Sequence, residues 1–354
     1  MIGWWVPGKV PEEVRRAIER LSTAGDVERV AVMPDVHLSD EVCVGVAVAT
    51  RERVYPAAIG GDVGCGVDAL PLGVDVDALH RVAPRVLAGF AREVPAERGH
   101  TEPLDLSWTD ERLARHAARV GRVQLGTLGS GNHFLELAAD DAEGLWMLVH
   151  SGSRAVGPEV ARVHLERAEV DPTGLRYLVG EARDLLLADL GAAEAWAAEN
   201  RASIQRRALA VLGDLLPISP GEPCTCCHNH VRREADRWVH RKGAIPAGEG
   251  KLGVIPGSMG APTYLVEGRG VPEALCSSSH GAGRAMSRAE AHARIRAHEL
   301  QAQMRGVWFD ERRAASLVDE APAAYKDIGK VMRAQRELTR IVGRLRPVLN
   351  YKGR

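Results

Sequence analysis

Short apolar runs, separated by proline and glycine, dominate the first part of the chain. Runs of β-branched and small apolar residues cover residues 28–34, 42–50 and 55–61, and a similar run covers residues 145–153. Runs of this length, bounded by Gly and Pro, are typical of β-strands. Further strand-like pieces lie between residues 250 and 266. The pattern therefore predicts a β-rich core.

Helical periodicity occupies segments between and after these runs. Apolar residues recur at helical spacing over residues 11–22 and 109–119, and Thr109 is the expected N-cap of the second segment. The Ala-, Leu-, Glu- and Arg-rich stretch 156–215 predicts helix, with an interruption near Pro172. Residues 285–354 are expected to be helical as well, apart from Pro347 and a short tail.

Residues with reactive side chains come from the whole length of the chain. No repeat, low-complexity linker or change in composition marks a domain boundary. Distant segments of one domain must converge if they share a central site. We therefore expect an α+β fold, a single domain over residues 1–354, with a β-rich core, flanking helices and a central metal-containing cleft.

Composition and charge restrict the location and the partners. The 354 residues are 45% hydrophobic and 26% charged, and their formal net charge of −1 argues against indiscriminate binding of polyanions. Basic clusters at residues 232–242 and 330–354 fit either phosphate-binding patches or solvated helix faces. The six cysteines are unevenly spaced, which favours free or metal-binding thiols in a reducing compartment. Without a signal-peptide pattern or an apolar run that could span a bilayer, we expect a cytoplasmic protein and no membrane partner.

Four histidines lie in short segments rich in Gly, Ser or Asn. These are His133, His150, His228 and His280. Small neighbours leave the imidazole accessible and let backbone amides approach a ligand. Each histidine taken alone is more often a structural or surface residue, but the four together favour a shared site.

The glycine-rich turn at residues 60–66 contributes further donor atoms. Asp62 and Cys65 are three residues apart, so a carboxylate and a thiolate can face the same region. With imidazole, they form a ligand set suited to zinc, manganese, iron or cobalt. The alternative is a tight turn in which Asp62 caps the backbone and Cys65 fills the core. A zinc knuckle over residues 224–230 is disfavoured, because adjacent residues cannot readily surround one tetrahedral ion.

Two segments have the composition of phosphate-binding loops. Residues 253–260 form a Gly/Ser loop, and His280 precedes a glycine-rich stretch that ends at Arg284. Neither segment matches the Walker A or the dinucleotide-binding pattern. The residues alone thus indicate a mononuclear or dinuclear metal site beside a phosphate-binding loop and a free histidine. That combination suits phosphoryl or nucleotidyl transfer.

The order of these segments resembles the RtcB family of RNA ligases from about residue 33 to residue 352. The matching strings are MPDVH (33–37), GGDVGCG (60–66), QLGTLGSGNHFLEL (124–137), HSGSR (150–154), CHN (227–229), RKGA (241–244), IPGSMGAPTYLV (255–266), SHGAGRAMSR (279–288), YKDI (325–328) and Tyr-Lys-Gly (351–353). The resemblance implies an enzyme that uses GTP and two Mn²⁺ ions. Its substrates would be an RNA 3′-phosphate or 2′,3′-cyclic phosphate end and a 5′-hydroxyl end, in RNA repair or tRNA splicing.

The resemblance also implies roles for individual residues. His280 would attack the α-phosphate of GTP and carry the resulting GMP. The implied metal ligands are Asp62, Cys65, His133, His150 and His228, with Cys65 bridging the two ions. The implied nucleotide contacts are Asn132, His133, Phe134, Leu135, Glu136, His228, Asn229, Pro256, Gly257, Ser258, Met259, Thr263, His280, Gly281, Ala282, Gly283 and Lys352.

Several positions depart from the family pattern, and other functions stay open. Residues 38–41 replace a stretch that is usually glycine-rich, and His230 and Thr263 are further departures. The alternatives are a metal-dependent phosphodiesterase or phosphatase on RNA ends and a non-catalytic RNA-binding relative. The retained His280 and Lys352 disfavour the first alternative, and the complete ligand set disfavours the second. Whether an archease-type helper protein takes part is left open by the sequence.

The C-terminal match leads to a specific structural expectation. If Lys352 reaches the base of the nucleotide, the tail must be ordered against the core, although chain ends are usually frayed. Removal of residues 351–354 is expected to cost little stability, because a tail ordinarily makes few core contacts.

Overall fold

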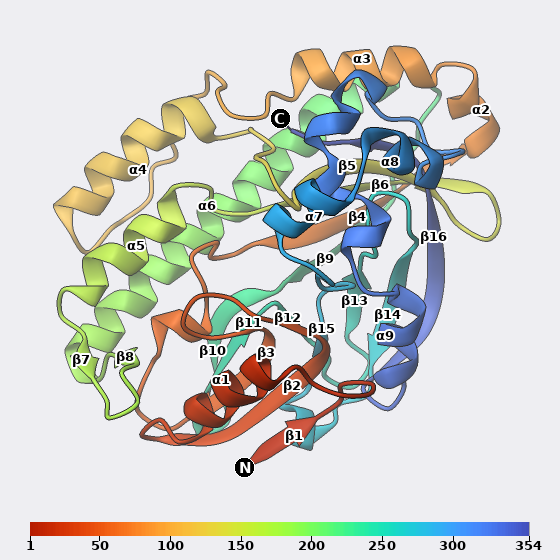
Figure 1. The fold of residues 1–354 in the computed structure, drawn as a ribbon. Helices are drawn as coiled ribbons and strands as arrows, with labels where there is room; N and C mark the ends of the chain where they lie inside the picture. The colour runs from red at the N-terminus through yellow and green to blue at the C-terminus, as the bar shows by residue number, and fades with distance from the viewer. Residues whose placement is uncertain (354) are drawn as a thin grey trace.

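Two β-sheets form the centre of the computed structural model, which describes residues 1–353 (Figure 1). The larger sheet is antiparallel throughout and contains, in spatial order, β13 (Leu252–Ile255), β14 (Thr263–Gly268), β16 (Thr339–Tyr351), β5 (Phe134–Ala139), β6 (Gly144–Ser151), β4 (Gly66–Asp75) and β9 (Cys224–Cys227). The smaller sheet contains β1 (Ile2–Trp4), β2 (Val27–His37), β3 (Val44–Thr50), β11 (Arg237–Lys242) and β10 (Asn229–Glu234), and only β1 and β2 are parallel. Two short pairs complete the strands, β12 (Ala244–Pro246) with β15 (Ser277–Ser279) and β7 (Glu169–Val170) with β8 (Arg176–Tyr177).

Helices cover the outer faces of these sheets (Figure 1). They are α1 (Glu12–Ser22), α2 (Val76–His80), α3 (Ala83–Glu93), α4 (Glu111–Gln124), α5 (Val156–Leu165), α6 (Gly180–Gly213), α7 (Arg288–Arg294), α8 (Ala297–Gln303) and α9 (Ile328–Ala334). Short 3₁₀ turns lie at Pro56–Ala58, Pro272–Ala274, Glu311–Ser316, Val318–Glu320 and Pro322–Ala324. None of the helices in residues 1–353 is both long and apolar enough to cross a membrane.

The central strands of the larger sheet are buried on both faces. Along β5, Leu135 and Leu137 pack with α3 and α6, whereas Phe134 and Ala138 pack against the side formed by β13, β14 and α9. A strand covered on both faces loses the alternation of apolar and polar residues that a half-exposed strand shows. Successive side chains of a strand point to its two opposite faces, which places Phe134 and Glu136 on the cavity side of β5.

Most of the predicted elements are present. The runs at 28–34, 42–50 and 145–153 correspond to β2, β3 and β6, and the pieces at 250–266 correspond to β13 and β14. The helices expected at 11–22, at 109–119 and within 156–215 are α1, α4, and α5 with α6. The interruption near Pro172 is the β7–β8 hairpin. The prediction of an α+β fold with a β-rich core is confirmed.

Three predictions about local structure were wrong. Residues 55–61 form a 3₁₀ turn rather than a strand, because Pro56 lacks the N–H that a ladder requires. The N-cap of α4 is Asp110, since Thr109 instead bonds Asp189 through both its N–H and its hydroxyl. Residues 339–351 form β16 rather than helix, because pairing with β14 and β5 outweighs local preference.

Candidate functional site

A cavity of about 510 Å³ is lined by segments of both sheets and by the loops that follow them. Its volume suits a ligand of nucleotide size. Most residues assigned to the site from the sequence line it: Asp62, Cys65, Asn132, Phe134, Glu136, His150, His228, Asn229, Pro256, Gly257, Ser258, Met259, Thr263, His280, Gly281, Ala282, Gly283 and Lys352. Two assigned residues do not line it. Leu135 lies on the opposite face of β5 in the apolar core, and His133 is buried beside Asp62 and Cys65.

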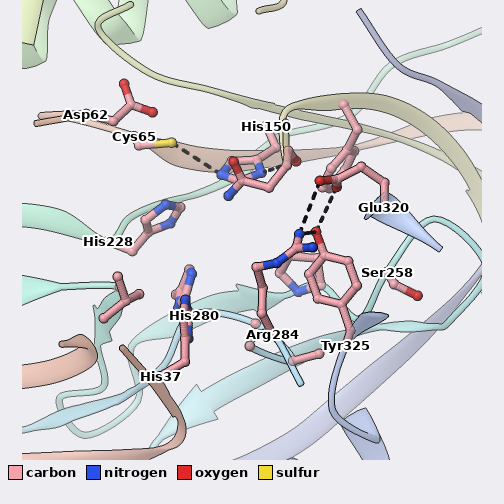
Figure 2. A pocket seen from close by; sticks show the side chains of 18 of the residues that line it. His37, Asp62, Cys65, His150, His228, Ser258, His280, Arg284, Glu320 and Tyr325 are labelled. Carbon is pink, nitrogen blue, oxygen red and sulfur yellow. Dashed lines mark hydrogen bonds and ion pairs between the residues drawn. The ribbon is translucent and has the colours of Figure 1, made fainter. Parts of the chain in front are cut away.

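Cys65, His133 and His150 form a buried group of potential metal ligands. Their donor atoms lie within 4.8 Å of one another. The Cys65 sulfur is 3.5 Å from Nε2 of His133 and 3.3 Å from Nε2 of His150. Asp62 adds a carboxylate oxygen 2.9 Å from Nε2 of His133. Figure 2 shows Asp62 and Cys65 on one side of this group, with His150 pointing at the sulfur.

Backbone carbonyl groups orient both imidazoles for metal binding. Nδ1 of His133 lies 3.0 Å from the carbonyl oxygen of Leu128, and Nδ1 of His150 lies 3.0 Å from that of Asn132. A carbonyl oxygen only accepts, so each Nδ1 carries the proton and each Nε2 presents a lone pair toward Cys65. Metal-binding histidines commonly use this arrangement, so the group fits a metal ion of the kind inferred from the sequence.

The ionisable groups of this cluster also suit a bound cation. Burial raises the pKa of the Cys65 thiol well above its ordinary value, and the Asp62 carboxylate raises it further. Burial opposes ionisation of Asp62, but the neighbouring His133 and Cys65 outweigh it, and the pKa of Asp62 is lowered to about 2. A metal ion would stabilise the thiolate that burial disfavours.

His228 connects the metal-ligand group to His280. Its ring centre is 5.2 Å from that of His150 and 4.7 Å from that of His280. Its backbone N–H donates to the Cys65 carbonyl oxygen at 2.9 Å, which ties the end of β9 to the glycine-rich turn. Nδ1 of His228 is buried without a hydrogen-bond partner among residues 1–353. Figure 2 shows His228 between Cys65 and His280.

His280 is held by a carboxylate rather than by the metal-ligand group. Its Nδ1 lies 2.7 Å from Oδ2 of Asp35, whose side chain is fully buried. The backbone N–H of His280 donates to the same oxygen at 3.3 Å. This pair fixes the ring and leaves Nε2 as the nitrogen available for chemistry. The neighbouring ring of His37 is kept neutral, because burial lowers its pKa to about 4.

At the far side of the cavity, the C-terminal Lys352 joins a buried network. Its Nζ lies 2.7 Å from Glu320 and donates to the Gly131 carbonyl oxygen at 3.1 Å. The hydroxyl of Tyr325 donates to Glu320 at 2.7 Å, and Arg284 lies 3.4 Å from the same carboxylate (Figure 2). The expectation that the tail is ordered against the core is confirmed for residues 351–353, and Arg354 lies outside the described residues.

The expectation that the tail contributes little stability was wrong. Tyr351 is buried in the core against Phe90, and its hydroxyl donates to the Val94 carbonyl oxygen at 2.8 Å. The side chain of Asn350 donates to Glu136 at 2.7 Å. These contacts arise because the tail continues β16, which pairs with β5 up to Tyr351. Burial raises the pKa of Glu136 to about 8, although the Asn350 bond opposes this.

The structure does not support two possibilities raised by the sequence, a zinc knuckle over residues 224–230 and a phosphate-binding patch at residues 232–242. Cys226 donates to the Val254 carbonyl oxygen, and neither it nor Cys224 belongs to the one cluster of possible metal ligands found in the described part of the chain. In the basic cluster at residues 232–242, Arg232 pairs with Glu194 and Arg241 with Glu234, so much of its charge is neutralised within the protein. That cluster lies on β10 and β11 rather than on a helix.

Sequence reasoning missed some residues that the structure brings to the cavity. Asp35, which bonds His280 without lining the cavity itself, and Tyr325, which lines it, lie inside the matched strings MPDVH and YKDI, so the resemblance could have pointed to them. Glu320 belongs to no matched string, and its sequence neighbours, Asp319 and Ala321, give no sign of a site. Only the fold shows that Glu320 is buried beside Lys352.

The fold and the site together define a class of protein. It is an α+β protein in which a buried Cys/His group that fits a metal ion lies close to a separate, carboxylate-held histidine at one cavity. The model of a family described as tRNA-splicing ligase RtcB matches residues 17–115 and 107–353. The chain belongs to the RtcB family.

Relatives of known name are similar over nearly the full length. The RNA-splicing ligase RtcB of Escherichia coli (strain K12) is 32% identical over 99% of this chain and 96% of its own length. The RNA-splicing ligase RtcB of Mycobacterium tuberculosis is 28% identical over 93% of this chain and 98% of its own length. The tRNA-splicing ligase RtcB of Nanoarchaeum equitans is 29% identical over 92% and 88%, respectively.

Proposed function

We propose that this chain is an RNA ligase that uses GTP and Mn²⁺ to join a 3′-phosphate or 2′,3′-cyclic phosphate end to a 5′-hydroxyl end. Its relatives are named as RNA-splicing and tRNA-splicing ligases, which supports the substrate class. The observation that carries the proposal is the position of His280. It lies 4.7 Å from His228, ring centre to ring centre, yet is held by Asp35 and is free to act as a nucleophile.

The residues around the cavity divide into three tasks. Asp62, Cys65, His133, His150 and His228 would hold two Mn²⁺ ions, with Cys65 as the shared ligand. Bound there, the metal would supply charge neutralisation for phosphate oxygens. The Gly/Ser loop 256–259 and residues 281–283 would accept the phosphates of GTP through backbone N–H groups. Lys352 and Glu136, which both line the cavity, would contact the base.

The reaction proposed for His280 is a transfer of GMP, first to its imidazole and then to the RNA, with no change of oxidation state. Its Nε2 attacks the α-phosphorus of GTP, a P–N bond forms, and pyrophosphate leaves. Asp35 accepts the hydrogen bond from Nδ1–H and stabilises the positive charge that develops on the ring. An oxygen of the RNA 3′-phosphate then takes the GMP from His280. Finally, the 5′-hydroxyl oxygen attacks the activated phosphorus, the P–O bond to GMP breaks, and the hydroxyl proton passes to solvent. An RNA end that begins as a 2′,3′-cyclic phosphate would first be opened by water to the 3′-phosphate.

The proposal is tested by incubating the protein with α-labelled GTP and Mn²⁺ and separating it on a denaturing gel. We expect a labelled band that is lost in acid and stable in base, as a phosphoramidate is. His280→Ala should abolish the label, whereas His298→Ala, which changes an exposed histidine on α8, should retain it. Labelling that survives His280→Ala would reject His280 as the nucleophile. Cleavage of 2′,3′-cyclic phosphate ends without any protein labelling would instead support the phosphodiesterase alternative.

A further inference from the structure

Helix α6 carries two adjacent polar side chains into the interior beneath the metal-ligand group. Asn200 is completely buried and Arg201 is 4% exposed. A buried guanidinium or amide is costly unless its hydrogen-bonding groups are satisfied. The hydrogen-bond partners of these two side chains therefore indicate why polar residues are buried here.

Arg201 joins the two segments that carry Cys65 and His150. Its guanidinium donates to the carbonyl oxygen of Gly64 at 2.8 Å and to that of Ser151 at 3.1 Å. Gly64 directly precedes Cys65, and Ser151 directly follows His150. A single side chain thus sets the distance between the backbone beside the thiolate and the backbone beside one imidazole.

The charge of Arg201 is balanced by a buried carboxylate on the neighbouring strand β4. Its Nε donates to Asp68 on β4 at 3.1 Å, and the side chain of Gln205 donates to the other oxygen of Asp68 at 2.7 Å. Burial raises the pKa of the Asp68 carboxyl, which Arg201 opposes. The guanidinium therefore has fixed partners on both sides and cannot swing away from the two carbonyl groups.

Asn200 joins the strand end at His150 to the loop that carries His133. Its Oδ1 accepts from the Gly126 N–H at 2.7 Å, and its Nδ2 lies 3.0 Å from the Ser151 hydroxyl. That hydroxyl donates to the Leu128 carbonyl oxygen at 2.9 Å. The same carbonyl oxygen is the one that holds Nδ1 of His133, so a chain of three hydrogen bonds links Asn200 to that imidazole.

The turn that carries Cys65 also rests directly on α6. Gly64 has φ of +70°, and a Cβ at this position would lie 2.9 Å from the Glu194 Cα and from the Ala197 Cβ. Glycine is therefore required both by the backbone conformation and by the close approach. The helix, the turn and the strand end are held as one rigid unit at the floor of the site.

We propose that Asn200 and Arg201 are positioning residues that hold the donor atoms of Cys65, His133 and His150 at their metal-binding separation before a metal ion arrives. This inference rests on the proposed function only in taking the Cys/His group to be a metal site. It assigns a task to α6, whose side chains do not line the cavity. Partners that fix ligand orientation commonly change metal affinity about 10- to 100-fold when removed.

Two variants and one control test the inference. Arg201→Lys keeps a positive charge, but a single ammonium cannot replace both Nε, which donates to Asp68, and Nη1, which donates to the two carbonyl groups. Asn200→Ala removes no charge and serves if the lysine variant does not fold. The control is Asp189→Asn. Asp189 lies on the same helix and forms an equally buried ion pair with His164 of α5, but it contacts no segment that carries a metal ligand.

The measurements are the dissociation constant for Mn²⁺ alone, the absorption spectrum with saturating Co²⁺, and the thermal midpoint of the metal-free protein. We expect the Mn²⁺ dissociation constant to rise about 10- to 100-fold in both variants, with a changed Co²⁺ spectrum. The control should lower the thermal midpoint and leave metal affinity and spectrum unchanged. Variants that lose stability but bind Mn²⁺ like the wild type, with an identical Co²⁺ spectrum, would overturn the inference. Failure of the wild type itself to bind Mn²⁺ would instead count against the proposed function.

Discussion

Replacing Lys352 with methionine isolates one buried charge without shortening the tail. The ammonium of Lys352 and the carboxylate of Glu320 are 2.7 Å apart, and both side chains are almost completely buried. Methionine preserves most of the length and packing of the lysine stem. The variant therefore leaves β16 and Tyr351 in place and removes only the cation beside Glu320.

The structure sets the size of the expected loss. Breaking a buried ion pair costs about 3–5 kcal/mol when the remaining charge is left without partners. Glu320 keeps the Tyr325 hydroxyl and the Arg284 guanidinium. We therefore expect a smaller loss in the free energy of unfolding at neutral pH, about 2–3 kcal/mol.

The loss should also depend on pH in a definite direction. Burial opposes ionisation of Glu320, but Lys352 outweighs burial and holds the pKa of the carboxyl below its ordinary value of 4.5. A carboxyl with a lowered pKa stabilises the folded state above the unfolded-state value, and that contribution is lost as the pH falls through the folded-state value. The difference between wild type and Lys352→Met should therefore shrink below about pH 4.5.

Urea denaturation of metal-free protein, across this pH range, measures the effect. Arg340→Met is a matched control, because it breaks an ion pair with Glu267 whose side chains are 60% and 32% exposed. Exposed pairs contribute only about 0–1 kcal/mol. The double variant Lys352→Met/Glu320→Gln, which removes both charges of the pair, should recover part of the loss. If Lys352→Met costs no more than Arg340→Met, or if the cost is independent of pH, the account of Glu320 as a carboxylate dependent on Lys352 is wrong.

Three further predictions concern the cavity. Cys65→Ser should lose most bound Mn²⁺, because a hydroxyl is a far weaker ligand than a thiolate, while Cys224→Ser should retain it. Elemental analysis after dialysis measures the metal content, and equal losses in the two variants would contradict the prediction. Asp35→Asn should slow labelling of the protein by α-labelled GTP about 10²- to 10⁴-fold, with unchanged metal content, because the amide no longer stabilises charge on His280. Burial raises the pKa of Glu136 from 4.5 to about 8, so wild-type stability should fall as the pH rises through this range, and Glu136→Gln should remove that dependence in urea titrations.

The elements that could be predicted from sequence are those in which local pattern and tertiary role agree. The helix α1 has a clear apolar face, with Val14, Ile18 and Leu21 buried, and its periodicity was sufficient to place it. The strand β16 has three arginines and a proline among its residues. Its identity as a strand depends on β14 and β5, which flank it in space, and no local pattern contains that information.

The same distinction applies to the site. Cys65 and the histidines are recognisable because thiolate and imidazole carry chemistry wherever they lie, and glycine-rich neighbours mark them. Arg201 and Glu320 could not be recognised, since an arginine in a helix and a glutamate in a loop usually face solvent. Their burial is decided by elements far away in sequence, β4 for Arg201 and the end of β16 for Glu320.

The place of β16 in the larger sheet has a consequence for biosynthesis. This strand is translated after every other strand of the sheet, yet it lies between β14 and β5 and pairs with both. While it is still inside the ribosome, two strand edges of the nascent chain have no partner, and unpaired edges invite association with other chains. Lys352 follows directly on β16. The cavity therefore cannot be completed until translation has passed the strand that closes the sheet.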